Sequence, residues 1–106
     1  MRGSFHIRVV QSVIHVFGSL RAPLRAELRH HVQAMLSRGE RRIDLNLAGV
    51  SDLDAAGLGE LVRMYNMASA SDAVVRVTHP SEHAREFLQR VGLLEVLSYG
   101  SPRLAV

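Results

Sequence analysis

The stretch SDLDAAGLGEL, residues 51–61, connects two segments whose apolar residues recur with different periods. Before it, RRIDLNL (residues 41–47) alternates apolar with polar side chains, as a strand buried on one face does. After it, helical spacing continues as far as SASD, residues 69–72, with an inward face formed by Leu58, Leu61, Val62 and Tyr65. Asp54 is the predicted N-cap of this helix, so the stretch predicts a corner between a strand and a helix.

Three other segments have the pattern of strands. FHIRVVQSVIHVF, residues 5–17, alternates twice around Gln11 and Ser12 and predicts two strands joined by a tight turn. AVVRVT, residues 73–78, predicts a further strand, and LLEVLSYG, residues 93–100, is the candidate for a short last one.

Two more helices are predicted from their start and stop signals. The first runs over residues 23–38, where Pro23 suits a first turn and Gly39 suits a C-terminal cap. Its predicted inward residues are Leu24, Leu28, Val32 and Met35. The other begins at His79-Pro80-Ser81 and stops at Gly92, and its predicted inward residues are Ala84, Phe87, Leu88 and Val91.

The alternation of strands and helices predicts an α/β fold with a four- to five-stranded mixed sheet, in a single domain over residues 5–106. Strands buried on both faces are almost entirely apolar, whereas these strands carry polar residues on the second face. Those residues are His6, Arg8, Arg42, Asp44, Asn46, Arg76 and Thr78. We therefore expect helices packed on one face only and a second face open to water or a partner.

Composition excludes several classes of function. The chain of 106 residues has no cysteine, which rules out disulfides, thiolate metal sites and thiol catalysis, and suits a reducing cytoplasm. The net charge is only +3 and the five aromatic residues are scattered, so no nucleic-acid partner is expected. No apolar run approaches the roughly 18 residues of a membrane span, so no membrane insertion is expected.

No catalytic or metal site can be assembled from the sequence. No Ser-His-Asp order, paired inward carboxylates or phosphate-binding glycine loop is present, because the GLG of residues 57–59 lies inside a helical turn. His79 and His83 are four residues apart, but Pro80 separates His79 from the helix and the HExxH spacing of zinc enzymes is missing. We expect neither an enzyme, nor a cofactor, nor a metal.

Three ordered motifs resemble the STAS domain, the family of bacterial anti-sigma-factor antagonists and of sulfate-transporter tails. LNLAGVSDLDAAGLGEL, residues 45–61, is similar to the family's strand followed by Asp-Ser-Ser-Gly-Leu-Gly at a helix start. FLQRVGLLEVL, residues 87–97, and VFGSLRAPLRAEL, residues 16–28, resemble the family's last helix and its Gly-x-Leu-Asp turn. The resemblance covers nearly the whole chain and implies a STAS-like fold.

The resemblance also implies a partner and a switch. Such proteins bind an anti-sigma factor, often a kinase-like ATPase, which in turn phosphorylates the second serine of Asp-Ser-Ser-Gly. The added charge then repels the partner. Here the two serines are replaced by Ala55 and Ala56, so the phosphoacceptor position holds Ala56 and has no hydroxyl. The aspartates of the turn and of the preceding strand are replaced by Arg21 and Asn46.

We therefore expect a docking surface that has lost its phosphorylation control. Its predicted partner-binding residues are Asp54, Ala55, Ala56, Gly57, Leu58, Gly59, Arg21 and Met67. Met67 falls opposite the apolar stripe of its helix and is expected to be exposed on a monomer. A methionine there is either merely tolerated or an adaptable contact for a partner. Arg21, Arg25 and Arg29 follow one another at four-residue steps, either as a solvated face or as a site for an acidic partner.

Two alternatives stay open at this point. Asp-Ala-Ala-Gly is a good helix start on intrinsic grounds alone and needs no partner to explain it. A structural STAS subunit of a transporter or of a stress-signalling complex is the second alternative, which the loss of the phosphorylation switch fits almost as well.

Overall fold

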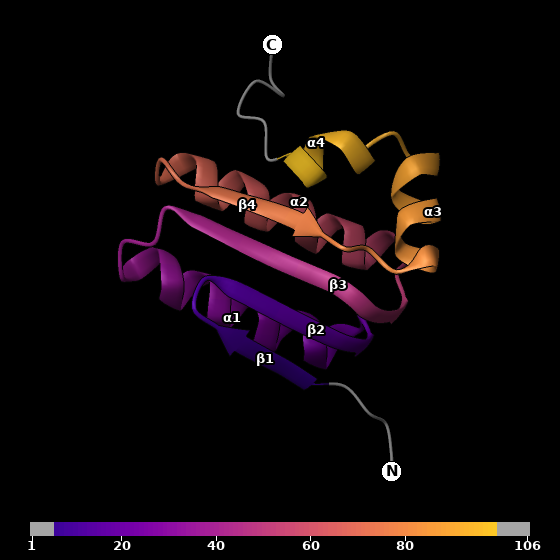
Figure 1. Ribbon diagram of the computed structural model, residues 1–106, viewed down its shortest axis with the longest axis horizontal. Helices are drawn as coiled ribbons and strands as arrows, with labels where there is room; N and C mark the ends of the chain where they lie inside the picture. The colour runs from indigo at the N-terminus through magenta and orange to yellow at the C-terminus, as the bar shows by residue number, and fades with distance from the viewer. Residues whose placement is uncertain (1–5, 100–106) are drawn as a thin grey trace.

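The computed structural model describes residues 6–99, with side chains described from Ile7 to Ser98. Within these residues a hairpin is followed by alternating helices and strands (Figure 1). The strands are β1 (His6–Val10), β2 (Val13–Ser19), β3 (Arg42–Asp52) and β4 (Val74–Thr78), and the helices are α1 (Ala22–Ser37), α2 (Ala55–Ala70), α3 (Glu82–Arg90) and α4 (Leu94–Tyr99).

The strands form one mixed sheet in the order β1-β2-β3-β4. β1 pairs antiparallel with β2, and Gln11 closes the tight turn between them with a φ of 57°. β2, β3 and β4 are parallel neighbours, because the connections through α1 and α2 return the chain to the same end of the sheet. The structure confirms the predicted hairpin and the mixed sheet. Of the four to five strands predicted, the described residues form four.

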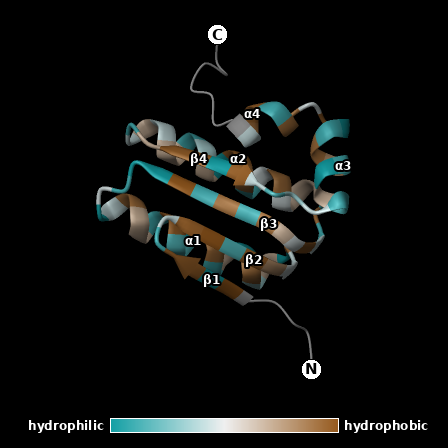
Figure 2. Cartoon of the chain, in the orientation of Figure 1, coloured by the Kyte–Doolittle hydropathy of each residue, from teal (hydrophilic) through white to brown (hydrophobic). Residues whose placement is uncertain are grey.

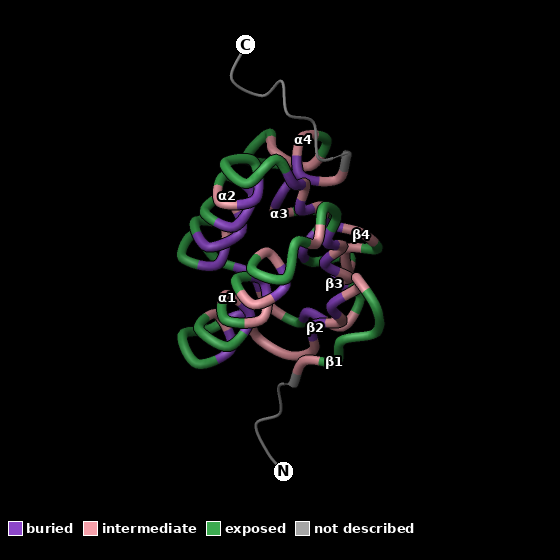
Figure 3. The backbone as a smooth tube through the Cα atoms, turned by 90° about the vertical axis from the view of Figure 1, so that its left-hand side faces the viewer, coloured by how far each residue is buried: buried purple, intermediate pink, exposed green. Residues whose placement is uncertain are grey.

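The core lies between the sheet and the helices α1 and α2. Both helices cover the same face of the sheet and turn their buried sides toward it (Figure 3). Leu24, Leu28, Val32 and Met35 of α1 are buried as predicted, as are Leu61 and Tyr65 of α2. Met64 is also fully buried, so the inward stripe of α2 lies closer to Met64 than the sequence indicated.

The second face of the sheet carries no helix of the described chain, as expected. Figure 1 views this face with α1 and α2 behind it, and Figure 2 shows polar and apolar residues alternating along β3. Arg76 of β4 donates two hydrogen bonds across this face to Asp44 of β3, at 3.0 and 3.3 Å. Hydrogen bonding to Asp44 and the charge of its carboxylate raise the pKa of Arg76.

The predictions for the last segment were partly wrong. Residues 94–99 form the helix α4 rather than a strand, and α4 lies along β4, where a fifth strand would have paired (Figure 1). Leu93, Leu94 and Leu97 have a helical spacing as well as an apolar run, and short apolar runs do not distinguish the two structures. Val91 is 42% exposed rather than inward, because α3 has already ended at Arg90.

Candidate functional site

The predicted corner between strand and helix is formed by the end of β3 and the start of α2. Asp54 is the N-cap, as predicted, and its Oδ1 accepts a hydrogen bond of 2.9 Å from the backbone N–H of Gly57. This hydrogen bond lowers the pKa of Asp54, and the positive charge of Arg25 lowers it further. The carboxylate is therefore held in its charged form at the positive end of the helix dipole.

The first turn of α2 presents two methyl groups to solvent. Ala55 and Ala56 are exposed, whereas the next residue, Gly57, is buried. A methyl group added at Gly57 would lie 2.7 Å from Leu53 Cδ1 and 3.2 Å from Leu20 Cδ2. Gly57 therefore permits close packing of the helix start on the core, and this packing turns Ala55 and Ala56 outward.

Gly59 and Leu58 occupy different environments on the same turn. A methyl group added at Gly59 would meet no atom within 4 Å, and the residue is exposed. Leu58 is half-buried and packs against the core cluster. Of the predicted surface residues between Asp54 and Gly59, the exposed ones are thus Asp54, Ala55, Ala56 and Gly59.

A polar cluster surrounds Asp52 at the same end of the sheet. Asp52 Oδ2 accepts a hydrogen bond of 3.4 Å from Ser19 Oγ and lies 4.0 Å from Arg21 Nη2. His83 Nε2 lies 3.4 Å from Asp52 Oδ1, which forms an ion pair when the imidazole is protonated. Asp52 therefore connects the turn after β2, the end of β3 and the first turn of α3.

Arg21 lies beside the corner, 4.0 Å from Asp52. It precedes α1, its Nε donates a hydrogen bond of 3.1 Å to Ser19 Oγ, and its side chain remains 74% exposed. Arg25, one turn further along α1, donates a hydrogen bond of 3.1 Å to the carbonyl oxygen of Leu20. Two guanidinium groups thus line the corner on the side of α1.

One interpretation of the four-residue spacing placed Arg29 on a solvated face. The structure instead places its guanidinium between α1 and α2. Its guanidinium forms two hydrogen bonds, of 2.9 and 3.0 Å, with the buried carboxylate of Glu60 on α2. Hydrogen bonding and the charge of Glu60 raise the pKa of Arg29. The arginines spaced at four residues therefore divide into Arg21 and Arg25 near the corner and Arg29 between the helices.

Met67 is separated from the other predicted residues. It lies thirteen residues after Asp54 on α2, about 20 Å along a helix that rises 1.5 Å per residue. The expectation that it is exposed was wrong, because Met67 is half-buried against the core and its sulfur lies 4.0 Å from Gln33 Nε2 on α1. The structure brings the corner and Arg21 together and leaves Met67 at the α1–α2 seam.

Sequence reasoning missed Ser19, Asp52 and His83 as members of one cluster. A usable signal was present, since Ser19 and Asp52 each end a strand, and the carboxyl ends of parallel strands meet at one edge of a sheet. His83 gave no such signal, because only the placement of α3 brings it to Asp52.

The described residues contain no other candidate centre of chemistry. Among residues 6–99, no group of three or more His, Asp or Glu side chains is placed to hold a metal ion. None of the helices in this part of the chain has both the length and the apolar character needed to cross a bilayer.

Solved structures of two proteins share this fold. The anti-sigma-factor antagonist SpoIIAA in its unphosphorylated form has a TM-score of 0.71 and 22% identity, over 87% of this chain and 84% of that chain. SpoIIAA in its phosphorylated form, described as a Bacillus cell-fate determinant, has a TM-score of 0.65 and 23% identity, with 85% of each chain covered. The NMR structure of the protein TM1081 has a TM-score of 0.69 and 21% identity, over 92% of this chain and 80% of that chain.

Sequence comparison identifies the family. None of the curated proteins matches the chain. The family model described as "Mlab, STAS domain" matches residues 4–98, which include every described strand and nearly all of α4. The chain therefore belongs to the STAS domain family.

Proposed function

We propose that this STAS domain is an anti-sigma-factor antagonist-like binding protein that acts in the cytoplasm in transcription regulation. It docks an anti-sigma factor or a kinase-like ATPase through the loop and helix that begin at Asp54. The observation that carries the proposal is the pair of exposed methyl groups, Ala55 and Ala56, at the capped start of α2. They give a rigid apolar contact at a helix end that the fold holds at its surface.

The surroundings of these methyl groups supply polar contacts at the rim of the surface. The exposed Arg21 side chain lies there 4.0 Å from Asp52, which also contacts His83. An apolar centre inside a polar rim is the usual arrangement of a protein interface. The charged rim would orient a partner, while Ala55, Ala56 and Gly59 allow its backbone or side chains to approach closely.

The proposed surface has no phosphorylation control at the expected position. SpoIIAA is an antagonist whose structure is known with and without phosphate. In the family pattern the acceptor is the second serine of Asp-Ser-Ser-Gly, and here that position is Ala56. A methyl group accepts no phosphate, so the protein remains in the dephosphorylated, binding-competent form.

A second candidate function follows from the same substitution. A STAS subunit that stabilises a transporter or a stress-signalling complex needs a docking surface without a switch, and Ala55 and Ala56 give such a surface. Co-purification from the native cell distinguishes the two. A sigma-factor regulator in stoichiometric amount supports the antagonist, whereas a stoichiometric transporter ATPase supports the structural subunit.

The docking surface is tested by titrating the purified partner against the unchanged chain and two variants. Ala56→Glu places a negative charge in the proposed surface, and Asn66→Glu places the same charge on an exposed position of α2, about 15 Å further along the helix. We expect Ala56→Glu to weaken binding by tenfold or more, by analogy with an added phosphate, and Asn66→Glu to leave it within about twofold. Equal affinities of the two variants would refute docking at this corner.

A further inference from the structure

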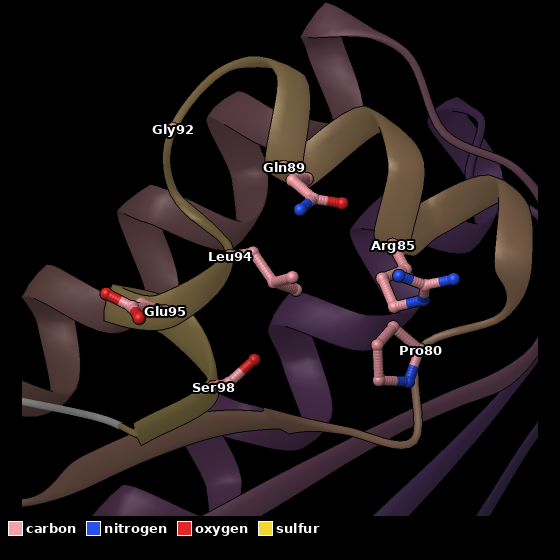
Figure 4. A pocket seen from close by; sticks show the side chains of 7 residues that line it. All are labelled: Pro80, Arg85, Gln89, Gly92, Leu94, Glu95 and Ser98. Atoms are coloured by element: carbon pink, nitrogen blue, oxygen red, sulfur yellow. The ribbon is translucent and has the colours of Figure 1, made fainter.

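A groove with an apolar wall and several polar side chains lies between α3 and α4, apart from the corner at Asp54. Its volume is about 590 Å³, within the range of roughly 300 to 1,000 Å³ that small-molecule sites occupy. The lining residues are Pro80, Arg85, Gln89, Gly92, Leu94, Glu95 and Ser98. The groove is therefore formed by one face of each helix and by the connections at their ends (Figure 4).

Hydrogen-bond donors converge on this groove. Arg85 and Gln89 are four residues apart on α3, and Leu94 and Ser98 are four residues apart on α4, so each pair shares a helix face. Figure 4 shows the side chains of Arg85, Gln89 and Ser98 directed toward a common space, with Leu94 between them. The carboxylate of Glu95 points away from that space (Figure 4).

The three donors are not used within the fold. In the described part of the chain, the side chains of Arg85, Gln89 and Ser98 form no hydrogen bond or ion pair with another residue. A guanidinium group on one wall of a groove, with neutral donors on the same and the facing wall (Figure 4), can bind the oxygens of a carboxylate or a phosphate.

The groove also has an apolar wall. Leu94, the first residue of α4, and Pro80, in the connection before α3, are half-buried and extend into the groove (Figure 4). A bare inorganic anion would leave this wall in contact with water, whereas an organic body attached to the anion would cover it. The flat guanidinium group of Arg85 can also stack on a planar ring.

We propose that the groove between α3 and α4 is a binding site for a small organic anion. The carboxylate or phosphate of the ligand binds Arg85, Gln89 and Ser98, and its compact apolar body contacts Leu94 and Pro80. This site is separate from partner docking at Asp54, and its test needs no partner protein.

The test is an NMR titration of the ¹⁵N-labelled chain with four probes that share one ring. Benzoate and phenyl phosphate carry the two candidate head groups, while benzyl alcohol and benzylamine carry a neutral and a cationic one. We expect saturable shifts at the amides of the lining residues with at least one of the two anions. Benzyl alcohol and benzylamine should bind at least tenfold more weakly. The anion with the lower Kd identifies the preferred head group.

Variants assign the site. Arg85→Gln should raise the Kd of the preferred anion about tenfold or more, the loss expected for a hydrogen-bonded charge. Arg90→Gln removes the same charge from an exposed position of α3 that does not line the groove, and should change the Kd by less than about twofold. Ser98→Ala should weaken binding severalfold.

Three results would overturn the proposal. The first is the absence of saturable shifts with both anions at 10 mM concentrations, at about 50 mM salt where screening is weak. The second is equal weakening by Arg85→Gln and Arg90→Gln, which would reduce the effect to general charge. The third is binding of inorganic phosphate as tight as that of phenyl phosphate, which would remove any role for the apolar wall.

Discussion

The guanidinium group of Arg29 forms two hydrogen bonds with the carboxylate of Glu60 and thereby joins α1 to α2. The side chain of Glu60 is only 7% exposed, whereas that of Arg29 is 36% exposed. A buried carboxylate is costly unless a hydrogen-bonded cation accompanies it, and Arg29 supplies that cation from the surface. The pair fixes α2 against α1, one and a half turns after the corner at Asp54.

Loss of this cation should destabilise the domain. Arg29→Met keeps most of the side-chain bulk but leaves Glu60 buried without its partner, so we expect a clear drop in Tm. Arg63→Met is the control, because Arg63 is an exposed arginine on α2. Thermal unfolding followed by circular dichroism compares them, and the double variant Arg29→Met with Glu60→Leu should recover part of the loss. A Tm for Arg29→Met equal to that of the control would contradict this role.

The two glycines of the first turns of α2 should respond oppositely to alanine. Gly57→Ala places a methyl group against the buried side chains of Leu53 and Leu20, and overpacking of a core costs about 1 to 3 kcal/mol, offset by a gain in helix propensity. Gly59→Ala meets open space and should stabilise the chain by up to about 1 kcal/mol. Urea unfolding measures both variants, and stabilisation by Gly57→Ala would refute the close approach.

The N-cap carboxylate should make stability depend on pH in the acid range. The folded state lowers the pKa of Asp54, so between the folded value and the unfolded value of about 3.9 the unfolded chain binds more protons. Stability from Asp54 is therefore complete above about pH 5 and is lost as the pH falls through the folded pKa.

Asp54→Asn isolates this contribution, because asparagine also caps helices but does not titrate. Melting curves of both forms should give the wild type an advantage in Tm at neutral pH. That advantage should shrink as the pH falls from about 5 to 2. A difference in Tm that does not change with pH would show that the charge of Asp54 makes no contribution.

The corner was predictable because its chemistry is local. Asp54 caps the helix through Gly57, three residues later, and the alternation of β3 needs only the contrast between buried and exposed faces. Both signals lie within a dozen residues of sequence. The STAS motifs then extended this local prediction to the whole fold.

The missed features depend on contacts between distant segments. Glu60 pairs with a residue 31 positions away, and Asp52 meets His83 only because α3 returns to the carboxyl ends of the strands. The helix α4 was mistaken for a strand because its apolar run fits both structures, and only its position along β4 decides between them. In these cases tertiary placement, rather than local propensity, determined the result.

Restoring a hydroxyl group at the proposed docking surface should restore the switch. Ala56→Ser returns the acceptor of the family pattern to an exposed position in the first turn of α2, where the helix dipole tolerates an added anion. Incubated with a kinase-type partner and ATP, this variant should gain one phosphate at position 56, detected by mass spectrometry. It should then lose affinity for the partner by tenfold or more.

The matched control for this experiment is Ala55→Ser, which carries the same hydroxyl one residue earlier and should remain unmodified. The wild-type chain should also remain unmodified under the same conditions. Phosphate on Ser19 or Ser51 of the wild type would mean that the chain has a second acceptor beside the same corner. In that case the replacement of two serines by Ala55 and Ala56 would have moved the switch rather than removed it.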